Sequence, residues 1–270
     1  MTLTLLKPPL DELLLPAGDA IAFIDGASGE AVTAGLRCSL VMRHGGRLLG
    51  RSRVTVSGVH HWPELAPRWR NADPAAPVLA DVIVRDELER FQPLSLPWPL
   101  PAIAAGQIIG GTVLGSARLL RVSLLSAPTR RPPPGMASIY GLLTWAASGA
   151  AAAWARVSYL DGDGRVHGGA SDTEGRLSLH LPRPRPNRPG SPPAPAAELR
   201  VFADPALATA SVGLGAPDLL AFAALPEVRA LADAGATTAY APPAFVTGEP
   251  LILATLGLSP AHRELRLAPI

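Results

Sequence analysis

Short alternations of apolar and polar residues fill the stretch 139–182. Turn motifs rich in Asp and Gly separate them, namely Asp161-Gly-Asp-Gly164 and Ser171-Asp-Thr-Glu-Gly-Arg176. Successive side chains of a strand point to opposite faces of a sheet, and Asp and Gly are residues that tight turns favour. The stretch therefore predicts consecutive antiparallel strands of a β-sandwich.

The N-terminal half carries the same pattern in a weaker form. Apolar stretches alternate there with turns such as Asp25-Gly-Ala-Ser-Gly29 and His44-Gly-Gly46. Residues 60–77 and 97–105 contain several Pro and predict irregular connections, because Pro cannot donate a hydrogen bond to a sheet. The predicted strands are 19–24, 36–43, 48–59, a hairpin of 78–84 and 91–97, and one or two strands within 107–125.

Pro-rich segments divide the chain into two predicted domains. The segment 126–135 is short and polar and contains four Pro, which is typical of linkers. We predict an all-β fold of two antiparallel β-sandwich domains joined by this linker. The predicted parts are an extended arm at 1–18, a sandwich at 19–125, the linker at 126–135 and a sandwich at 136–270, with a Pro-rich loop at 183–195, a short helical segment near 219–234, and strands at 199–203, 251–256 and 265–267.

A short sequence match between the two halves of the chain raises the possibility of a duplication. In residues 86–97 and again in 172–182, a turn is followed by Arg and by a strand that ends in Leu-x-Leu-Pro. The match is short, so the sequence leaves open whether the two domains are copies of one another.

Composition agrees with short strands and many turns. Hydrophobic residues make up 48% of the chain and charged residues 17%, which argues against wholesale disorder. The 30 Pro and 26 Gly are more than a helical protein tolerates.

Charge and cysteine usage narrow the function. The net charge is only +2 and the Arg residues are scattered, so nucleic acid is not an expected partner. Cys38 is the single Cys, which excludes an intramolecular disulfide and a multi-Cys metal site. The N-terminus lacks a signal-peptide pattern, and no run of about 18 apolar residues occurs, so we expect a cytoplasmic protein, or one assembled there, with no membrane insertion.

The second domain resembles the carboxypeptidase regulatory-like domain, a transthyretin-like β-sandwich of seven strands. The resemblance rests on the turn Ser148-Gly149, on Ala155-Arg-Val157 and on Asp172-x-x-Gly175-Arg176-Leu177. The first domain offers a similar opening, Asp25-x-x-Ser28-Gly29-x-x-Val32. The resemblance implies a non-catalytic module that stiffens a protein or mediates contacts, although many relatives are secreted and this chain shows no export signal.

Two clusters of polar residues invite a metal site. Asp161-Gly-Asp-Gly164 offers closely spaced carboxylates, but Arg165 and Val166 stand where a calcium loop needs a ligand and Gly, so a tight turn is the better interpretation. His60-His61-Trp-Pro-Glu64 is expected to be an exposed loop, because adjacent His side chains diverge on a strand. No Gly-x-Ser-x-Gly motif is present, and we expect neither an enzyme nor a cofactor.

Aromatic and apolar residues are the remaining candidates for a functional surface. Trp145 and Trp154 lie in strand-like segments and should fill the core. We expect a structural subunit or adaptor in a larger protein assembly, such as a phage-tail-like or contractile injection particle by analogy. The alternatives are a carbohydrate-binding module, with Trp62 and Trp69 as its platform, and an unrecognised enzyme. The candidate partner-contact residues are Leu5, Leu10 and Leu14 of the arm and Trp62, Trp69 and Trp98 of Pro-rich loops.

Overall fold

The protein is an all-β molecule, as the sequence predicts. The computed structural model describes residues 20–70, 78–100, 119–183, 197–210, 215–235, 240–243, 249–258 and 263–270. Strands dominate these residues, and the helices among them are short. Two separate clusters of buried apolar side chains form the cores of two sandwiches, which we call the N-terminal and the C-terminal sandwich.

The N-terminal sandwich packs two four-stranded sheets against each other. One has the order β4-β5-β1-β8 and the other the order β3-β2-β6-β7. The core side chains Phe23, Leu40 and Leu96 are fully buried between them. The strands are β1 (Ala20–Asp25), β2 (Leu36–Met42), β3 (Leu48–Arg51), β4 (Arg53–Val54), β5 (Val59–His61), β6 (Val78–Asp86), β7 (Leu94–Leu100) and β8 (Leu119–Leu124), with the single turn α1 (Pro67–Arg70) after β5.

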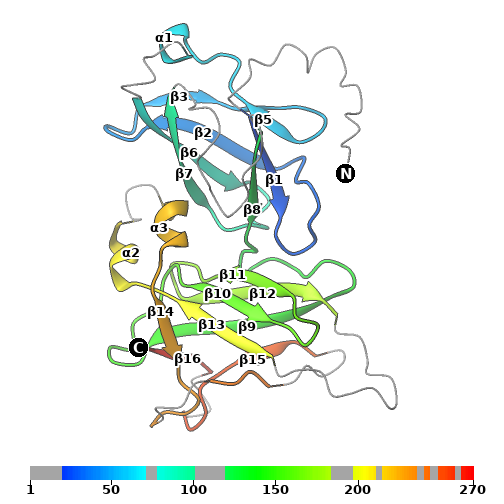
Figure 1. The fold of residues 1–270 in the computed structure, drawn as a ribbon, viewed down its shortest axis with the longest axis vertical. Helices are drawn as coiled ribbons and strands as arrows, with labels where there is room; N and C mark the ends of the chain where they lie inside the picture. Colours follow the sequence, from blue (N-terminus) through cyan, green and yellow to red (C-terminus); the bar gives the residue numbers. More distant parts are fainter. Residues whose placement is uncertain are drawn as a thin grey trace.

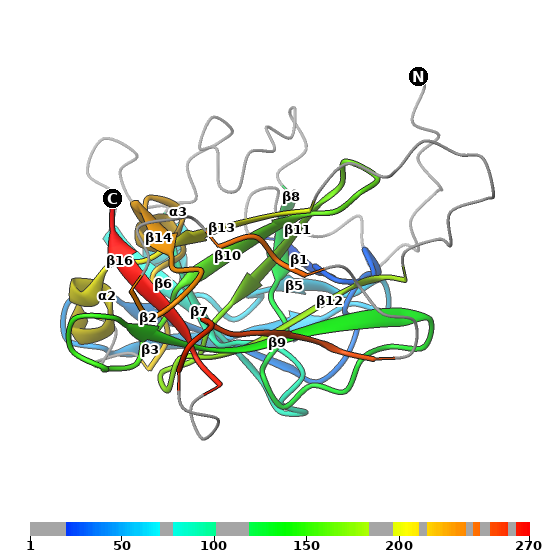
Figure 2. The ribbon, with the colours of Figure 1, turned by 90° about the horizontal axis from the view of Figure 1, so that it is seen from below.

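The C-terminal sandwich is one continuous sheet folded over its core. Its order is β11-β10-β13-β14-β16-β9-β12, and β15 also pairs with β9. Seen from below, the long strand β9 runs across the sandwich with β16 beside it (Figure 2). The strands are β9 (Met136–Trp145), β10 (Arg156–Leu160), β11 (Val166–Ala170), β12 (Arg176–Pro182), β13 (Glu198–Phe202), β14 (Glu227–Ala230), β15 (Leu251–Leu253) and β16 (Leu265–Pro269).

Both sandwiches repeat the same strand order. The row β5-β1-β8 recurs as β12-β9-β16, in each case antiparallel on one side of the middle strand and parallel on the other. The row β3-β2-β6-β7 recurs as β11-β10-β13-β14. The turns after β1 and β9 also match: Gly29 N–H donates to the Asp25 carbonyl and Gly149 N–H to the Trp145 carbonyl, both at 2.8 Å. The chain is therefore a structural duplication.

The sequence match between residues 86–97 and 172–182 reflects a turn that recurs in the structure, and the strands that follow the two turns are not equivalent. Asp86, Asp161 and Asp172 each accept hydrogen bonds from the backbone N–H groups two and four residues later. The residue three positions after each of them has a positive φ. The Asp86 turn joins β6 to β7 and the Asp172 turn joins β11 to β12, which are different places in the repeated order.

The structure corrects several local predictions. Residues 219–234 form only the short helix α3 (Leu219–Ala223), and the rest includes strand β14, which pairs with β13 and β16. The stretch 60–77 begins inside β5 and not in a loop. Strand β7 continues through Pro97 to Leu100, because its outer edge does not require the N–H groups that Pro lacks. The sheets are not wholly antiparallel, since β1–β8, β9–β15 and β9–β16 are parallel pairs. The predicted arm at 1–18, most of the loop at 183–195 and residues 101–118 lie outside the described residues.

The two sandwiches stack along the long axis of the molecule (Figure 1). The connection from β13 to β14 carries α2 (Pro205–Ala210) and α3, which lie between the sandwiches on one side. In the part of the chain that the structure describes, no helix has the length and apolar character needed to cross a membrane.

Candidate functional site

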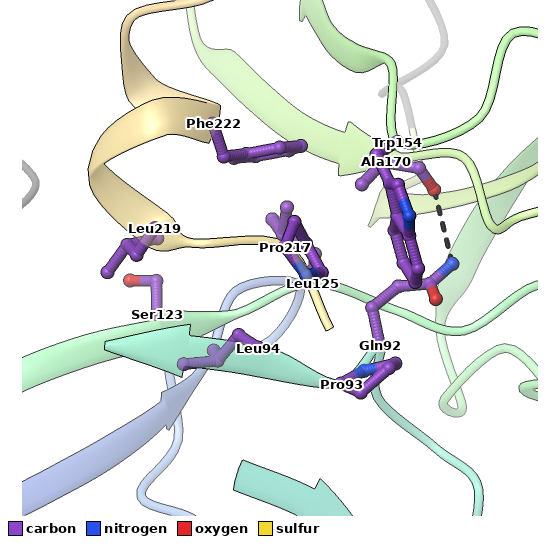
Figure 3. A pocket seen from close by; sticks show the side chains of 10 residues that line it. All are labelled: Gln92, Pro93, Leu94, Ser123, Leu125, Trp154, Ala170, Pro217, Leu219 and Phe222. Carbon is purple, nitrogen blue, oxygen red and sulfur yellow. Dashed lines mark hydrogen bonds between the residues drawn. The ribbon is translucent and has the colours of Figure 1, made fainter. Parts of the chain in front are cut away.

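The candidate site is the junction, where the two sandwiches contact each other. Its apolar centre joins Trp154, Ala170 and Phe222 of the C-terminal sandwich with Leu125, which follows β8. They surround a cavity of about 30 Å³, which is room for one or two water molecules (Figure 3). Gln92 reaches across from the N-terminal sandwich and donates from Nε2 to the Ala170 carbonyl at 3.5 Å.

Trp154 occupies this centre at a cost in backbone strain. Its φ is +57°, in the left-handed region that bulky residues rarely adopt. In the N-terminal sandwich, Gly35, directly before β2, also has a positive φ, of +84°. A residue held in this region costs about 1–3 kcal/mol unless surrounding contacts compensate. Only 4% of Trp154 is exposed, so its burial against the junction supplies that compensation.

Pro217 and Asp218, directly before α3, join the C-terminal sandwich to the N-terminal one. We call this segment the strap. Ser95 N–H in β7 donates to the Pro217 carbonyl at 2.9 Å, and Ser95 and Asp218 form a parallel β-bridge. Arg43 lies 2.5 Å from the buried carboxylate of Asp81 and 3.3 Å from that of Asp218. Asp218 also accepts from two backbone N–H groups at the start of α3. One carboxylate thus ties the strap to the sheet and begins the helix.

The predicted linker packs on the N-terminal sandwich next to the junction. Arg130 donates from Nη1 and Nη2 to the two carboxylate oxygens of Asp25, at 2.8 and 2.5 Å, and both side chains are about nine-tenths buried. Its guanidinium also lies 4.8 Å from the centre of the Phe91 ring. Burial raises the pKa of Asp25, but hydrogen bonds from Arg130, the Ala27 N–H and Ser28, with the charge of Arg130, lower it to about 2. Ala127 N–H donates to the Arg90 carbonyl, so this stretch packs on the N-terminal sandwich instead of hanging free.

His180 lies next to this pair, on the C-terminal sandwich. Its Nδ1 is 3.0 Å from Ser138 Oγ and its Nε2 is 3.2 Å from Ser178 Oγ. Burial lowers the pKa of His180 and the charge of Arg130 lowers it further, while a hydrogen bond with the Arg130 backbone and the charge of Asp25 oppose this. A Ser–His contact can serve nucleophilic catalysis, but these three side chains are at most 6% exposed and closed to a substrate.

The tryptophans predicted to contact a partner are mostly inside the molecule. Trp62 and Trp98 are 3% and 7% exposed and lie with ring centres 6.1 Å apart in the N-terminal core, which corrects the expectation that they face outward. Neighbouring Pro residues suggested loops, whereas Trp98 lies in β7. Trp69 is only partly buried. Trp154 is buried as predicted, and Trp145 is partly buried against the C-terminal core. Leu5, Leu10 and Leu14 lie outside the described residues.

The polar clusters have structural roles among the described residues. Asp161-Gly-Asp-Gly164 is the tight turn between β10 and β11, and Asp161 Oδ2 lies 2.7 Å from His167 Nε2. His60 is 1% exposed with Nδ1 at 2.9 Å from Ser52 Oγ, so the expected exposed loop is wrong there. Burial raises the pKa of the Cys38 thiol to about 12, which leaves it a core residue. The described ranges contain no group of three or more His, Cys, Asp or Glu side chains placed to hold a metal.

Sequence reasoning missed the residues that build the junction. The sequence marks Asp25 only as a turn residue and Arg130 only as part of a polar linker. The Trp154 pattern predicted burial but not its partner, because the strap lies more than 60 residues away along the chain. A single Asp before an apolar stretch, as at Asp218, is a helix-start signal that could have revealed the strap.

Comparison with known proteins adds little to this geometry. No protein-family model matches the chain, and no curated protein matches it. Among solved structures, the Bacillus anthracis TIE protein matches with a TM-score of 0.24 and 8% identity, covering 70% of this chain and 28% of that one. The chain thus spans less than a third of that protein. Two Bacteroides ovatus proteins named as candidate adhesins match with TM-scores of 0.23 and 0.18 and identities of 9% and 12%, covering 70% and 75% of this chain and 72% and 84% of theirs.

Proposed function

We propose that the protein is a non-catalytic structural subunit or adaptor within a larger protein assembly. The observation that carries this proposal is the junction, where the strap and an apolar centre join the two sandwiches and a buried ion pair holds the linker to the N-terminal one. Such a contact suits a part that must hold a defined spacing between the neighbours at its two ends.

The nature of the contacts supports a stiff connection. Flexible two-domain proteins have exposed linkers with few contacts between domains. Here Ser126 and Ala127 are buried, and Arg130 is held by Asp25 and Ser126. The strap adds main-chain hydrogen bonding to the outer edge of β7. Rotation of one sandwich against the other would break the contacts of the strap with β7 and the hydrogen bond from Gln92 to Ala170.

The repeated seven-strand order is consistent with the resemblance to carboxypeptidase regulatory-like domains. The Asp172-x-x-Gly175 turn lies between β11 and β12, where Gly175 has φ +78°. We propose that both sandwiches are modules of this kind, that the protein is assembled in the cytoplasm, and that a tail-like or contractile particle is a suitable setting by analogy. Carbohydrate binding has lost one of its two platform candidates, since Trp62 lies in the core, whereas Trp69 is partly buried.

The proposal can be tested by measuring the size of the particle with which the protein sediments in extracts of its native host. A tagged chain should sediment with a particle much larger than its own 28.0 kDa. Arg130→Met should reduce incorporation, whereas Arg53→Met, at an exposed ion pair with Glu64, should not. Wild-type protein that sediments only as a free monomer, under conditions in which it is abundant, would overturn the proposal.

A further inference from the structure

An aromatic ring with two arginines stacked on it lies at the end of the N-terminal sandwich that is farthest from the C-terminal one. The guanidinium carbon of Arg68 is 4.9 Å from the centre of the Trp69 ring, and that of Arg47 is 5.9 Å from it. Trp69 belongs to α1, which lies at the distal end of the molecule (Figure 1). Arg47 directly precedes β3, the edge strand of its sheet.

The two positive charges at this ring are not neutralised within the described residues. Several other arginines near a sheet surface have a carboxylate partner, such as Asp86 for Arg90 or Glu227 for Arg200. No described carboxylate forms an ion pair with Arg47 or Arg68. Stacking on an aromatic ring holds a guanidinium in place while its N–H groups stay available for an anion.

From this arrangement we infer that Arg47, Arg68 and Trp69 form a binding site for an acidic segment of a partner protein. The site rests on the proposed function, because it would be the contact that the distal end makes with a neighbour. The guanidinium carbons are no more than about 11 Å apart, so carboxylates two residues apart in an extended segment, about 7 Å along the chain, can reach both.

The bulge at β3 and the small number of cations limit the kind of partner that the site can bind. The register between β2 and β3 shifts at Leu40 and Val41, and such a bulge interrupts the regular ladder that an added strand would need. The side chains, and not the free edge of β3, therefore carry the recognition. Two cations also fall short of the several phosphate contacts that nucleic-acid binding uses, so a short acidic peptide fits better.

A labelled peptide provides a direct test. A fluorescein-labelled heptapeptide of alternating Glu and Leu should bind the full-length protein at 50 mM NaCl with a Kd of about 0.1 mM or below. Affinity should fall at least threefold at 300 mM NaCl, because exposed ion pairs are screened. The matching peptide of Gln and Leu should bind at least tenfold more weakly.

Matched variants separate this site from general charge. Arg47→Glu/Arg68→Glu should lose at least tenfold in affinity, and Arg47→Lys/Arg68→Lys should lose only a few fold, because Lys keeps the charge but not the planar stacking. Arg121→Glu/Arg165→Glu changes two exposed arginines elsewhere by the same charge and should bind like wild type. Unchanged thermal midpoints would show that the variants are folded, and the Lys variant serves if the Glu variant is not.

Three results would overturn the inference. They are no binding by wild type at 1 mM protein, an equal loss in both charge-reversal variants, and tighter binding of a 15-nucleotide single-stranded DNA that depends on Arg47 and Arg68. Any of these, with the tagged chain still sedimenting in a large particle, would remove this site and leave the proposed function standing.

Discussion

Loss of either partner of the Asp25–Arg130 pair should destabilise the protein by several kcal/mol. Their side chains are 10% and 8% exposed, and both carboxylate oxygens are bound. Removing one partner of a buried pair leaves the other charge unsatisfied, which costs about 3–5 kcal/mol. Arg130→Met should lie at the upper end of this range, because it also removes the contacts of the guanidinium with Ser126 and Phe91.

The same pair should make stability depend on acid. The pKa of Asp25 is about 2 in the folded protein against an ordinary value of 3.8, so the unfolded chain takes up its proton first as the pH falls. The carboxylate therefore contributes fully above about pH 4 and loses its contribution as the pH falls through 2. The shift corresponds to about 2 kcal/mol. This is less than the cost of deleting a partner, because protonated Asp25 still fills its place and accepts hydrogen bonds.

Urea unfolding followed by tryptophan fluorescence can measure both effects. We expect Asp25→Asn, Arg130→Met and the double variant to show a coupling energy of at least about 1 kcal/mol at pH 7. Asp25→Asn should also flatten the loss of stability between pH 4 and 2.5. Arg53→Met, at a pair whose side chains are 68% and 74% exposed, should cost less than about 1 kcal/mol. A coupling energy near zero, or an unchanged acid slope in Asp25→Asn, would refute the assignment of this pair as a buried structural contact.

Three further substitutions test other parts of the structure. Trp154→Ala should lower the free energy of unfolding by about 3–5 kcal/mol, and Trp154→Gly by about 1 kcal/mol less, since Gly relieves the positive φ; equal thermal midpoints for the two would contradict the strain. His180→Gln should reduce the loss of stability as the pH drops below 6.5, because the lowered folded pKa means that the unfolded chain protonates first; urea titrations at pH 7 and 5 measure this, and an unaltered difference would argue against it. Gly175→Ala would place a Cβ 2.4 Å from the Leu143 carbonyl oxygen and should lower the free energy of unfolding by more than about 2 kcal/mol. Gly149→Ala, with a similar φ and open space around the Cβ, should lower it by about 1 kcal/mol. Similar losses for the two variants in calorimetry would mean that the close approach at Gly175 is relieved.

Local patterns were sufficient to predict most strands but not how the sheets are arranged. The alternation at 36–43 and 78–84 and the turn at 161–164 needed only neighbouring residues, and β2, β6 and the β10–β11 turn follow them. The parallel pairing of β1 with β8 depends on residues about 100 positions apart, which no local pattern encodes. Trp98 shows the same limit, because its flanking Pro residues favour a loop while the core behind β7 decides its burial.

The duplication explains why the junction is the informative surface. Where the two sandwiches have the same turn, they form the same backbone hydrogen bond, as at Gly29 and Gly149. They differ where the C-terminal copy meets the N-terminal one. A short turn joins β6 to β7, but the equivalent connection from β13 to β14 carries two helices and the strap. Trp154 likewise combines a positive φ with burial in this contact, whereas the positive φ before β2 falls on Gly35. Changes that serve neither core concentrate at one contact, which supports the proposal that this chain holds two similar modules in a fixed relation.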